Sequence, residues 1–414
     1  MTSQQAPTHG ARRAPSRAPR GRKALWPVPL LALSLATASL GATYPSHPSA
    51  ASLAPGMSVG SQAAASCVDK VYSAMTGPQR VGQLFMGSIT AAKPDQKRIQ
   101  VLQQYHVGSV FLAGRSKAGA KATKSLVDSL QAKADTVSKH RVGLLVSTDQ
   151  EGGQVQVLSG PGFSTMPSGL VQGSWSTSKL RAEAATWAKQ LKAAGVNLNL
   201  APVADVVPLS LGRNNAPIGR YDREYGHTAA AVTPHSNAFA AGFAQSNVLA
   251  TLKHFPGLGN VRGNTDTTAN VVDTVTTSKS SSLTPFSSGI KAGAPFVMIS
   301  LATYNKIDPK HQAVFSPTVI QGLLRKSMGF KGVVVSDDLG NAVAVKAVPP
   351  ADRALNFLSA GGDLVLAGEP NQLPAMTKAV TARMAQSSAF RTQVDQSVHR
   401  ILTAKQKVGL LTCS

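Results

Sequence analysis

Short hydrophobic runs recur along the chain after residue 80, each bounded by glycine, proline or polar residues. Runs of this length with such boundaries are typical of buried strands. Between them lie amphipathic stretches such as TSKLRAEAATWAKQLKAA and SPTVIQGLLRKSM, whose apolar residues recur every three or four positions and whose first residues include serine or threonine suited to capping a helix. The eight runs are VGQLFMG at 81, VGSVFLAG at 107, VGLLVSTDQEGG at 142, VNLNLAPVADV at 196, VLATLKHFPG at 248, PFVMISLA at 295, GVVVSDDLG at 332 and GGDLVLAG at 361.

Eight strands that alternate with helices predict an α/β fold, and the number of strands is that of a (β/α)8 TIM barrel. We expect this barrel to form a single catalytic domain over residues 67–414. The chain of 414 residues, 43% of them hydrophobic, is long enough to bury one large core. A doubly wound open sheet is the alternative fold.

The N-terminus has the pattern of an export signal. A basic stretch, ARRAPSRAPRGRK, precedes the apolar run ALWPVPLLALSLATASLGA, which ends in small residues. We therefore predict a signal peptide over residues 1–42. An uncleaved membrane anchor is the alternative, although Pro27 and Pro29 interrupt the run and it is short for a membrane span.

Residues 43–66 are rich in proline, serine and alanine and are predicted to form a flexible segment. We expect the mature protein to be secreted or associated with the cell wall, to have no stable membrane span and to be a monomer.

The chain has only two cysteines, Cys67 and Cys413, at the two ends of the predicted barrel. Because an exported chain enters an oxidising compartment, we predict a disulfide between them. This bridge requires a fold whose ends meet, as the ends of a closed barrel do. Two unrelated thiols are the alternative.

The chain is strongly basic, with 42 Lys and Arg against 19 Asp and Glu and a formal net charge of +23. Such a charge attracts polyanions over roughly a Debye length. The basic residues are scattered, few aromatic residues lie among them, and no nucleic-acid-binding motif is present, so we do not expect a nucleic acid partner. Anionic cell-wall polymers are the expected partners, and a merely solubilising surface is the alternative.

Polar side chains follow five of the eight runs, at the points where the predicted strands end. The catalytic groups of a (β/α)8 barrel lie at the carboxyl ends of its strands, so these side chains should meet at one mouth. Any one of them can instead cap a helix or face water, above all Asp205, Asp338 and Glu369. The full set is Asp149, Glu151, Asp205, Lys253, His254, Asp337, Asp338 and Glu369.

The motifs limit the chemistry at this mouth. No zinc-binding spacing and no Gly-x-Ser-x-Gly motif occurs, and we expect no metal or organic cofactor. The stretch GRSKAGAKAT resembles a phosphate-binding loop but has Ala120 in the place of its lysine, and we interpret it as a flexible loop. Glycoside hydrolysis needs one carboxylate as nucleophile and a second group that protonates the leaving oxygen. Carbohydrate chemistry therefore fits best.

Three ordered motifs, DQEGG at 149, KHFPG at 253 and SDDL at 336, resemble those of glycoside hydrolase family 3. The chain is most similar to the single-domain bacterial β-N-acetylglucosaminidases of that family. The likeness runs from Gly77 to Leu411 and ends in HRILTAKQKVGLL, which resembles the closing helix of the family. It implies an exported, retaining β-N-acetylhexosaminidase that removes terminal N-acetylglucosamine from cell-wall or chitin-derived oligosaccharides.

The resemblance also implies roles for individual residues. Asp337, the first acid of SDDL, would be the nucleophile that forms a covalent glycosyl-enzyme intermediate. Asp149, Lys253 and His254 would bind sugar hydroxyls, and Arg223 in RYDREYG would line the same subsite. For Arg223, a surface salt bridge with Asp222 or Glu224 is the alternative.

The loop after KHFPG departs from the family pattern. The relatives carry an Asp-Ser-His there, whose histidine is the general acid/base, whereas this chain has Asn264, Thr265 and Asp266. Leu258 also replaces a histidine of the relatives, and Val157 replaces an arginine that contacts substrate. We take Asp266 as the candidate acid/base, because burial near Asp337 would raise its pKa.

Other interpretations of this loop stay open. Glu151, or Asp308 in KIDPKHQ, would then supply the proton, while His311 in the same segment is expected to be an exposed loop residue. Alternatively the barrel is catalytically impaired and binds wall glycans without cutting them. A family 3 β-glycosidase or phosphorylase with a different sugar specificity is the last alternative.

Overall fold

The computed structural model describes residues 66–413. The predicted signal peptide and residues 43–65 of the predicted flexible segment lie outside the described residues. Among the helices of residues 66–413, none is both long enough and apolar enough to cross a membrane.

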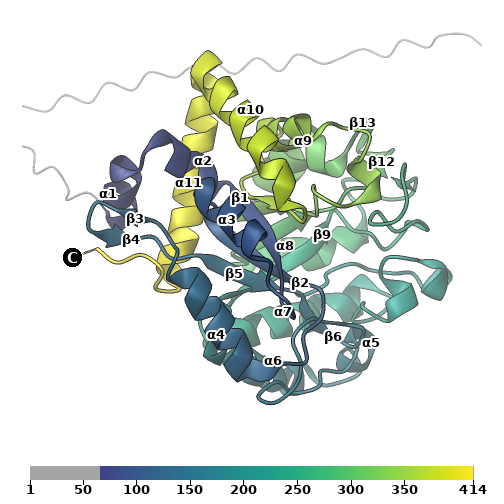
Figure 1. The fold of residues 1–414 in the computed structure, drawn as a ribbon. Helices are drawn as coiled ribbons and strands as arrows, with labels where there is room; N and C mark the ends of the chain where they lie inside the picture. Colours follow the sequence, from purple (N-terminus) through teal and green to yellow (C-terminus); the bar gives the residue numbers. More distant parts are fainter. Residues whose placement is uncertain (1–65, 414) are drawn as a thin grey trace, which may run out of the picture. The chain divides into compact units, whose positions relative to one another are not determined.

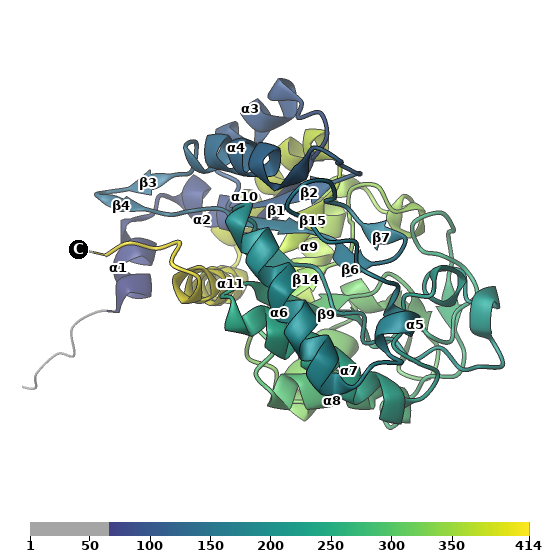
Figure 2. The same ribbon diagram turned by 90° about the horizontal axis from the view of Figure 1, so that it is seen from below.

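Eight parallel strands form the centre of the molecule (Figures 1 and 2). Seven of them lie within a predicted run, and β1 begins in the first run, at residues 81–87, and extends three residues beyond it. Their order in the sheet is β14-β11-β9-β8-β5-β2-β1-β15. The strands are β1 (Phe85–Thr90), β2 (Ser109–Ala113), β5 (Leu145–Thr148), β8 (Leu198–Asn199), β9 (Leu249–Phe255), β11 (Phe296–Ile299), β14 (Val333–Ser336) and β15 (Val365–Ala367).

The two ends of this sheet meet and close a barrel. Val335 of β14 forms a parallel bridge with Leu364, just before β15, and the backbone N–H of Leu364 donates to the carbonyl of Val334 at 3.0 Å. The predicted (β/α)8 barrel is therefore confirmed, and the alternative of an open doubly wound sheet is wrong because β14 and β15 are neighbours.

At least one helix follows each barrel strand, and Figure 2 shows these helices arranged around the strands. Ser176 caps α6 by accepting from the backbone N–H of Lys179 at 3.2 Å, and Ser316 accepts from that of Val319 at 3.1 Å at the start of η5. The helices are α1 (Cys67–Ala74), α2 (Gly77–Gln83), α3 (Gln96–Gln104), α4 (Gly119–Gln131), α5 (Gly169–Gln172), α6 (Thr177–Ala193), α7 (Ala229–Gln245), α8 (Thr284–Lys291), η5 (Thr318–Ser327), α9 (Pro350–Ser359), α10 (Leu373–Gln386) and α11 (Ser388–Lys407).

Short strands extend the connections at the carboxyl ends of the barrel strands. β6 (Gln150–Gly152) and β7 (Val155–Gln156) form a hairpin after β5. β10 (Val272–Asp273), β12 (Thr303–Tyr304) and β13 (Asp308–Gln312) form a small sheet from the connections after β9 and β11. At the opposite end of the barrel, β3 (Thr136–Val137) and β4 (His140–Arg141) form a second hairpin.

One predicted loop is partly helical. The stretch from Gly114 to Thr123, predicted as a flexible loop, is irregular only as far as Ala118, because α4 begins at Gly119. The alternation of small and apolar residues in KATKSLV lets Thr123 and Val127 face the core, one turn apart. Ala120, which stands where a phosphate-binding loop has its lysine, is therefore the second residue of an ordinary helix.

The two ends of the described chain lie side by side. Figure 1 shows α1, in purple, next to α11, in yellow. The structure contains the predicted disulfide, with the Cα atoms of Cys67 and Cys413 5.7 Å apart. The predicted closing helix of HRILTAKQKVGLL is the second half of α11.

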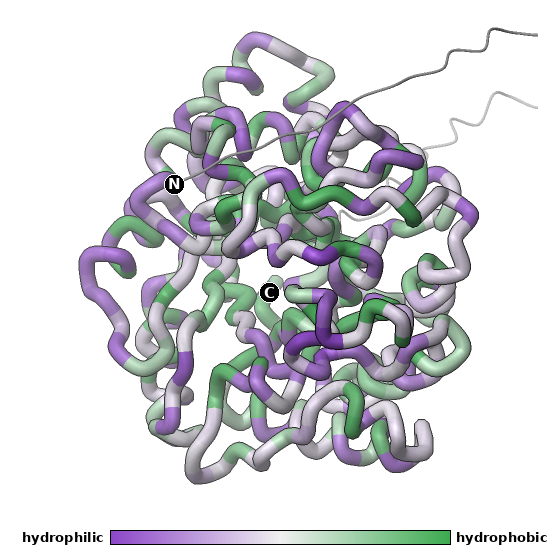
Figure 3. The backbone as a smooth tube through the Cα atoms, turned by 90° about the vertical axis from the view of Figure 1, so that its right-hand side faces the viewer, coloured by the Kyte–Doolittle hydropathy of each residue, from purple (hydrophilic) through white to green (hydrophobic). Residues whose placement is uncertain are grey.

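The hydrophobic core fills the barrel and the space between the strands and their helices. Phe85, Val146, Val297, Val334 and Val365, one from each of five barrel strands, have no exposed surface. In Figure 3 hydrophobic segments pass through the middle of the molecule, and hydrophilic segments are more frequent along its outer loops. The rigid barrel therefore fixes the positions from which the polar side chains at its carboxyl end project.

Candidate active site

A cavity of about 210 Å³ opens at the carboxyl ends of the barrel strands. Its floor is apolar, and its walls carry most of the polar residues that the sequence placed at the ends of strands. The lining residues are Phe111, Asp149, Leu200, Pro217, Arg223, Lys253, His254, Leu258, Asn264, Thr265, Asp266, Met298, Asp337, Asp338 and Leu366.

Glu151 is the centre of a buried ion-pair network at this cavity. Its Oε2 accepts from Nε of Arg223 at 2.8 Å, and its Oε1 accepts from a terminal nitrogen of Arg223 at 2.7 Å and lies 2.6 Å from Nζ of Lys253. Lys253 also donates to Asp149 at 2.6 Å. Glu151 lies in β6 of the hairpin β6–β7, and the side chain of Asn199 fixes this hairpin at Gln150. Nδ2 of Asn199 donates to the carbonyl of Gln150 at 2.9 Å, and its Oδ1 accepts from the N–H of Gln150 at 3.0 Å.

The charges of this network set its protonation. Burial alone would raise the pKa of Glu151, but Arg223 and Lys253 outweigh it and lower that pKa to about 2. Burial opposes the charge of Lys253, yet Asp149 and Glu151 raise its pKa above the usual value. Arg223 therefore pairs with Glu151 inside the site, and the alternative of a surface salt bridge with Asp222 or Glu224 is wrong.

His254 is oriented by a buried carboxylate. Its Nδ1 lies 2.7 Å from Oδ2 of Asp205, which has no exposed surface. Oδ1 of Asp205 accepts from the backbone N–H groups of His254 and Leu258 at 3.2 and 2.7 Å. Since Nδ1 donates to the carboxylate, Nε2 is left facing Arg223, 3.5 Å away, at the cavity wall.

Asp337 follows β14 directly, and its carboxylate faces the cavity. Its Oδ1 accepts from the backbone N–H of Asp338 at 2.9 Å. Burial raises the pKa of Asp337 to about 6; the charge of Asp266 acts in the same direction, and those of His254 and Lys253 oppose it. Asp337 and Asp266 line the same cavity, and the charge of Asp266 disfavours the ionisation of Asp337.

Asp266 lies on the rim of the cavity, in the irregular connection after β9. Its backbone N–H donates to the side chain of Asn264 at 2.9 Å, which makes a tight turn. Desolvation by the surrounding site, together with the charges of Asp338 and Asp149, raises its pKa, and Arg223 and His254 oppose this rise. Asp266 is exposed and lines the cavity, so its carboxylate can reach a group that enters.

The remaining polar candidates have structural contacts. Asp338 lines the cavity, but its Oδ1 accepts from the backbone N–H groups of Gly340 and Gly368 at 2.7 and 2.9 Å. Glu369 pairs with Arg98 at 2.9 Å, accepts from the backbone N–H of Asn371 and does not line the cavity, so the alternative of a helix cap is confirmed for this residue.

Asp308 is also outside the cavity. It starts β13, where it accepts from the hydroxyl of Ser316 at 2.6 Å and lies 3.0 Å from Nδ1 of His311. His311 is exposed, as predicted, but belongs to β13 and not to a loop. Two positions where the relatives have polar residues hold Leu258 and Val157 in this chain. Leu258 is buried and lines the cavity. Val157, directly after the hairpin β6–β7, is also buried but does not line the cavity.

Sequence patterns missed the residues that hold the site groups in place. Asn199 and Asn264 act on the backbone of Gln150 and Asp266, and Asp205 was equally well explained as a helix cap. Asn199 lies inside the fourth predicted run, where no local pattern distinguishes it, and Asn264 was named only as a departure from the family motif.

Comparison with known proteins agrees with this geometry. Residues 78–404 match the family model of the glycosyl hydrolase family 3 N terminal domain. The beta-hexosaminidase of Xanthomonas axonopodis pv. citri is 33% identical over 297 residues, which are 70% of this chain and 84% of that protein. The beta-hexosaminidase of Xylella fastidiosa is 37% identical over 258 residues, 60% of this chain and 73% of that protein.

Solved structures show the same likeness. The β-N-acetylhexosaminidase of Beutenbergia cavernae is 48% identical with a TM-score of 0.78, over 80% of this chain and 99% of that one. A family 3 β-N-acetylglucosaminidase of Paenibacillus is 29% identical with a TM-score of 0.73, over 82% of this chain and 65% of that one. This chain therefore belongs to glycosyl hydrolase family 3 and is a glycoside hydrolase.

Proposed function

We propose that the protein is an exported, retaining β-N-acetylhexosaminidase that removes terminal N-acetylglucosamine from cell-wall or chitin-derived oligosaccharides. The observation that carries the proposal is the pair of carboxylates, Asp337 and Asp266, at one cavity with a buried cluster of hydroxyl-binding groups. The names of the similar proteins support the sugar. The basic leader and the net charge of +23 support export to an anionic cell envelope.

In the proposed first step, the ionised carboxylate of Asp337 attacks the anomeric carbon and forms a glycosyl ester. The bond to the leaving oxygen breaks, and Asp266 gives its proton to that oxygen. In the second step Asp266 takes a proton from water, which attacks the same carbon and releases Asp337 as a carboxylate. Two displacements at one carbon retain the β configuration.

The buried network supports the binding of a single terminal sugar. Asp149 and Nζ of Lys253 present an acceptor and a donor at the cavity, and Nε2 of His254 adds a third polar contact. Charge-assisted hydrogen bonds of this kind are the stronger ones and fix orientation. The apolar floor of Phe111, Met298 and other residues closes the cavity below the sugar.

Asp266 is a better proton donor than the two alternatives. Glu151 is held ionised by Arg223 and Lys253, with a pKa of about 2, so it carries no proton to give. Asp308 does not line the cavity, and its contacts with Ser316 and His311 outweigh burial and lower its pKa. Asp266 combines a raised pKa with a position on the rim where a leaving group would exit.

The test compares Asp337→Asn and Asp266→Asn with the wild type, with Asp308→Asn as the control. The substrates are 4-nitrophenyl N-acetyl-β-glucosaminide, 4-nitrophenyl β-glucoside and N,N′-diacetylchitobiose. We expect Asp337→Asn to lose more than about 1,000-fold in kcat on every substrate that the wild type cleaves. Asp266→Asn should lose about 10²- to 10⁴-fold in kcat/KM on the disaccharide but little in kcat/KM on the nitrophenyl glycosides, whose leaving group needs little acid assistance in the first step. Its kcat should fall on both kinds of substrate, because Asp266 is also the base of the second step.

Asp308→Asn should behave as the wild type. Full activity of Asp337→Asn would exclude it as the nucleophile, and an equal loss for Asp308→Asn and Asp266→Asn would exclude a specific acid role for Asp266. If the wild type cleaves none of the three substrates, the proposed activity is wrong and a barrel that only binds wall glycans takes its place.

A further inference from the structure

The backbone around Asp266 is held by the connection that follows the proposed nucleophile. The carbonyl of Asp266 accepts from the N–H of Val343 at 3.1 Å, and that of Thr265 accepts from the N–H of Ala344 at 3.0 Å. Val343 and Ala344 start the short helix η6 (Val343–Val345), which lies in the connection between β14 and α9. The same connection begins with Asp337. The two carboxylates therefore lie on segments that are hydrogen-bonded to each other.

Gln312 in turn fixes η6. Its side-chain nitrogen donates to the carbonyl of Ala344 at 2.8 Å and to the carbonyl of Leu301 at 2.9 Å. Leu301 is fully buried directly after β11. One amide group thus joins the connection after β14 to the connection after β11, using both of its N–H donors.

The strand that carries Gln312 belongs to the small sheet β10-β12-β13, which also holds the far end of the Asp266 connection. Gln312 is opposite Thr303 of β12, and the N–H of Thr303 donates to the carbonyl of Val271 at 2.9 Å. The connection of Asp266 is therefore anchored at two places, at residues 265–266 through η6 and at residues 271–273 through β12. Figure 1 shows β12 and β13 together at one side of the barrel.

From this arrangement we infer that Gln312 is a positioning residue for the acid/base step, which it serves by fixing η6 and through it the backbone of Asp266. The inference rests on the role proposed above for Asp266. A general acid must lie within hydrogen-bond reach of the leaving oxygen, and Asp266 projects from an irregular loop on an exposed rim. Gln312 touches neither the cavity nor Asp266, so it acts only through the backbone that it holds.

The test removes the anchor and measures how strongly the rate depends on the leaving group. Gln312→Met keeps the length of the side chain and removes both donors. The matched control is Gln321→Met, on the exposed face of η5, whose amide donates to the carbonyl of Ser359 at 3.3 Å, away from the site. The substrates are N,N′-diacetylchitobiose and a series of aryl N-acetyl-β-glucosaminides from 4-nitrophenyl to phenyl.

We expect Gln312→Met to lower kcat/KM on the disaccharide by about 10- to 100-fold, with little loss of kcat/KM on the 4-nitrophenyl glycoside. The plot of log(kcat/KM) against the pKa of the leaving phenol becomes steeper. Gln321→Met leaves the plot of the wild type unchanged. A general loss of packing would instead lower the rates of all substrates together.

A second variant tests the same anchor from the other side. Val343→Pro removes only the N–H that donates to Asp266, and proline is tolerated there because Val343 is the first residue of η6 and Ala342 before it is extended, with ψ of 132°. It should steepen the plot as Gln312→Met does. If both variants leave the slope unchanged, or lower all rates equally, the inference is wrong. If Asp266→Asn itself leaves the slope unchanged, the fault lies in the role proposed for Asp266.

Discussion

Two carboxylates of the site, Glu151 and Asp337, show how neighbours decide the state of a side chain. Both are buried, and burial alone raises the pKa of each. Glu151 has Arg223 and Lys253 at hydrogen-bond distance, which bring its pKa to about 2, whereas Asp337 faces Asp266 and keeps a pKa of about 6. A permanent anion behind the cavity wall and a carboxylate in the cavity that titrates near neutrality thus belong to one site.

The pKa of Asp337 predicts the acid side of the pH profile. As a nucleophile Asp337 must be ionised, so kcat/KM on the 4-nitrophenyl glycoside should rise with pH through about 6. Burial and the charge of Asp266 hold this pKa up, and Asp266→Asn removes the second of these causes. The rise should therefore move to lower pH in Asp266→Asn. A rise at an unchanged or higher pH would show that the two carboxylates do not interact as described.

At the scale of elements, the site depends on how closely the connections after β8 and β9 pack. The amide nitrogen of Asn215, which is fully buried, donates to the carbonyls of Leu258, Gly259 and Val261 at 2.7, 3.2 and 2.8 Å. A Cβ atom on Gly259 would lie 1.8 Å from the carbonyl oxygen of Val206. Only a glycine lets the two backbones approach this closely, and this contact places Leu258 in the cavity wall.

Gly259→Ala should therefore disturb the connection that carries Asp266. Overpacking against a backbone oxygen costs about 1–3 kcal/mol of unfolding free energy, which denaturant titration can measure. The value of kcat/KM should fall with it, since the cavity wall shifts. Gly77→Ala is the control, because a Cβ atom there would meet nothing within 4 Å. Equal stability of the two variants would contradict the close packing described here.

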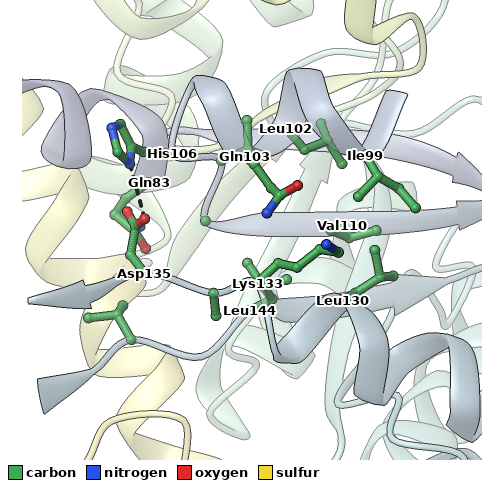
Figure 4. Close-up of a pocket in the computed structure, with 14 residues that line it drawn as sticks. Gln83, Ile99, Leu102, Gln103, His106, Val110, Leu130, Lys133, Asp135 and Leu144 are labelled. Carbon is green, nitrogen blue, oxygen red and sulfur yellow. Dashed lines mark hydrogen bonds and ion pairs between the residues drawn. The ribbon is translucent and has the colours of Figure 1, made fainter. Parts of the chain in front are cut away.

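At the scale of the whole molecule, a cavity of about 30 Å³ lies at the amino ends of the barrel strands, opposite the candidate active site. Figure 4 shows its lining, with Asp135 paired to Nδ1 of His106 at 3.0 Å. Beside it, Nζ of Lys405 from α11 donates to Oε1 of Gln83 from α2 at 2.6 Å. Lys405 is completely buried, and burial lowers its pKa to about 7, against the opposing effect of Asp135.

This buried lysine predicts how stability depends on pH. The unfolded chain binds the proton of Lys405 up to its ordinary pKa of 10.5, whereas the folded chain releases it above about 7. Between these values the unfolded state holds more protons, so the free energy of unfolding rises with pH. From pH 7 to about 9 the wild type should gain about 2 kcal/mol relative to Lys405→Met.

The comparison of each variant with the wild type at both pH values cancels the contributions of the other titrating groups. Lys407→Met, two residues further on and exposed, is the control and should follow the wild type. Denaturant titration measures all three proteins. If Lys405→Met follows the wild type as well, Lys405 does not release its proton in the folded state.

The sequence by itself determined the barrel, because buried strands and amphipathic helices are local patterns of apolar residues. Each of the eight predicted runs overlaps a barrel strand, and seven contain the whole strand. The ends of those runs also located Asp149, Lys253, His254 and Asp337, since a parallel barrel brings the carboxyl ends of its strands to one mouth. Cys67 and Cys413 were paired because the chain contains no others and a closed barrel brings its ends together.

Only the tertiary structure decided which partners these groups have. Glu151 and Arg223 are 72 positions apart, His254 and Asp205 are 49 apart, and no local pattern relates them. The same holds for the contact between Gln312 and Ala344. Lys405 is a second case, because a lysine on an amphipathic helix is expected to face water, whereas this one is fully buried. Hydrophobic periodicity fixes which face of an element is buried, whereas the pairing of polar groups depends on loop geometry and on contacts between distant segments.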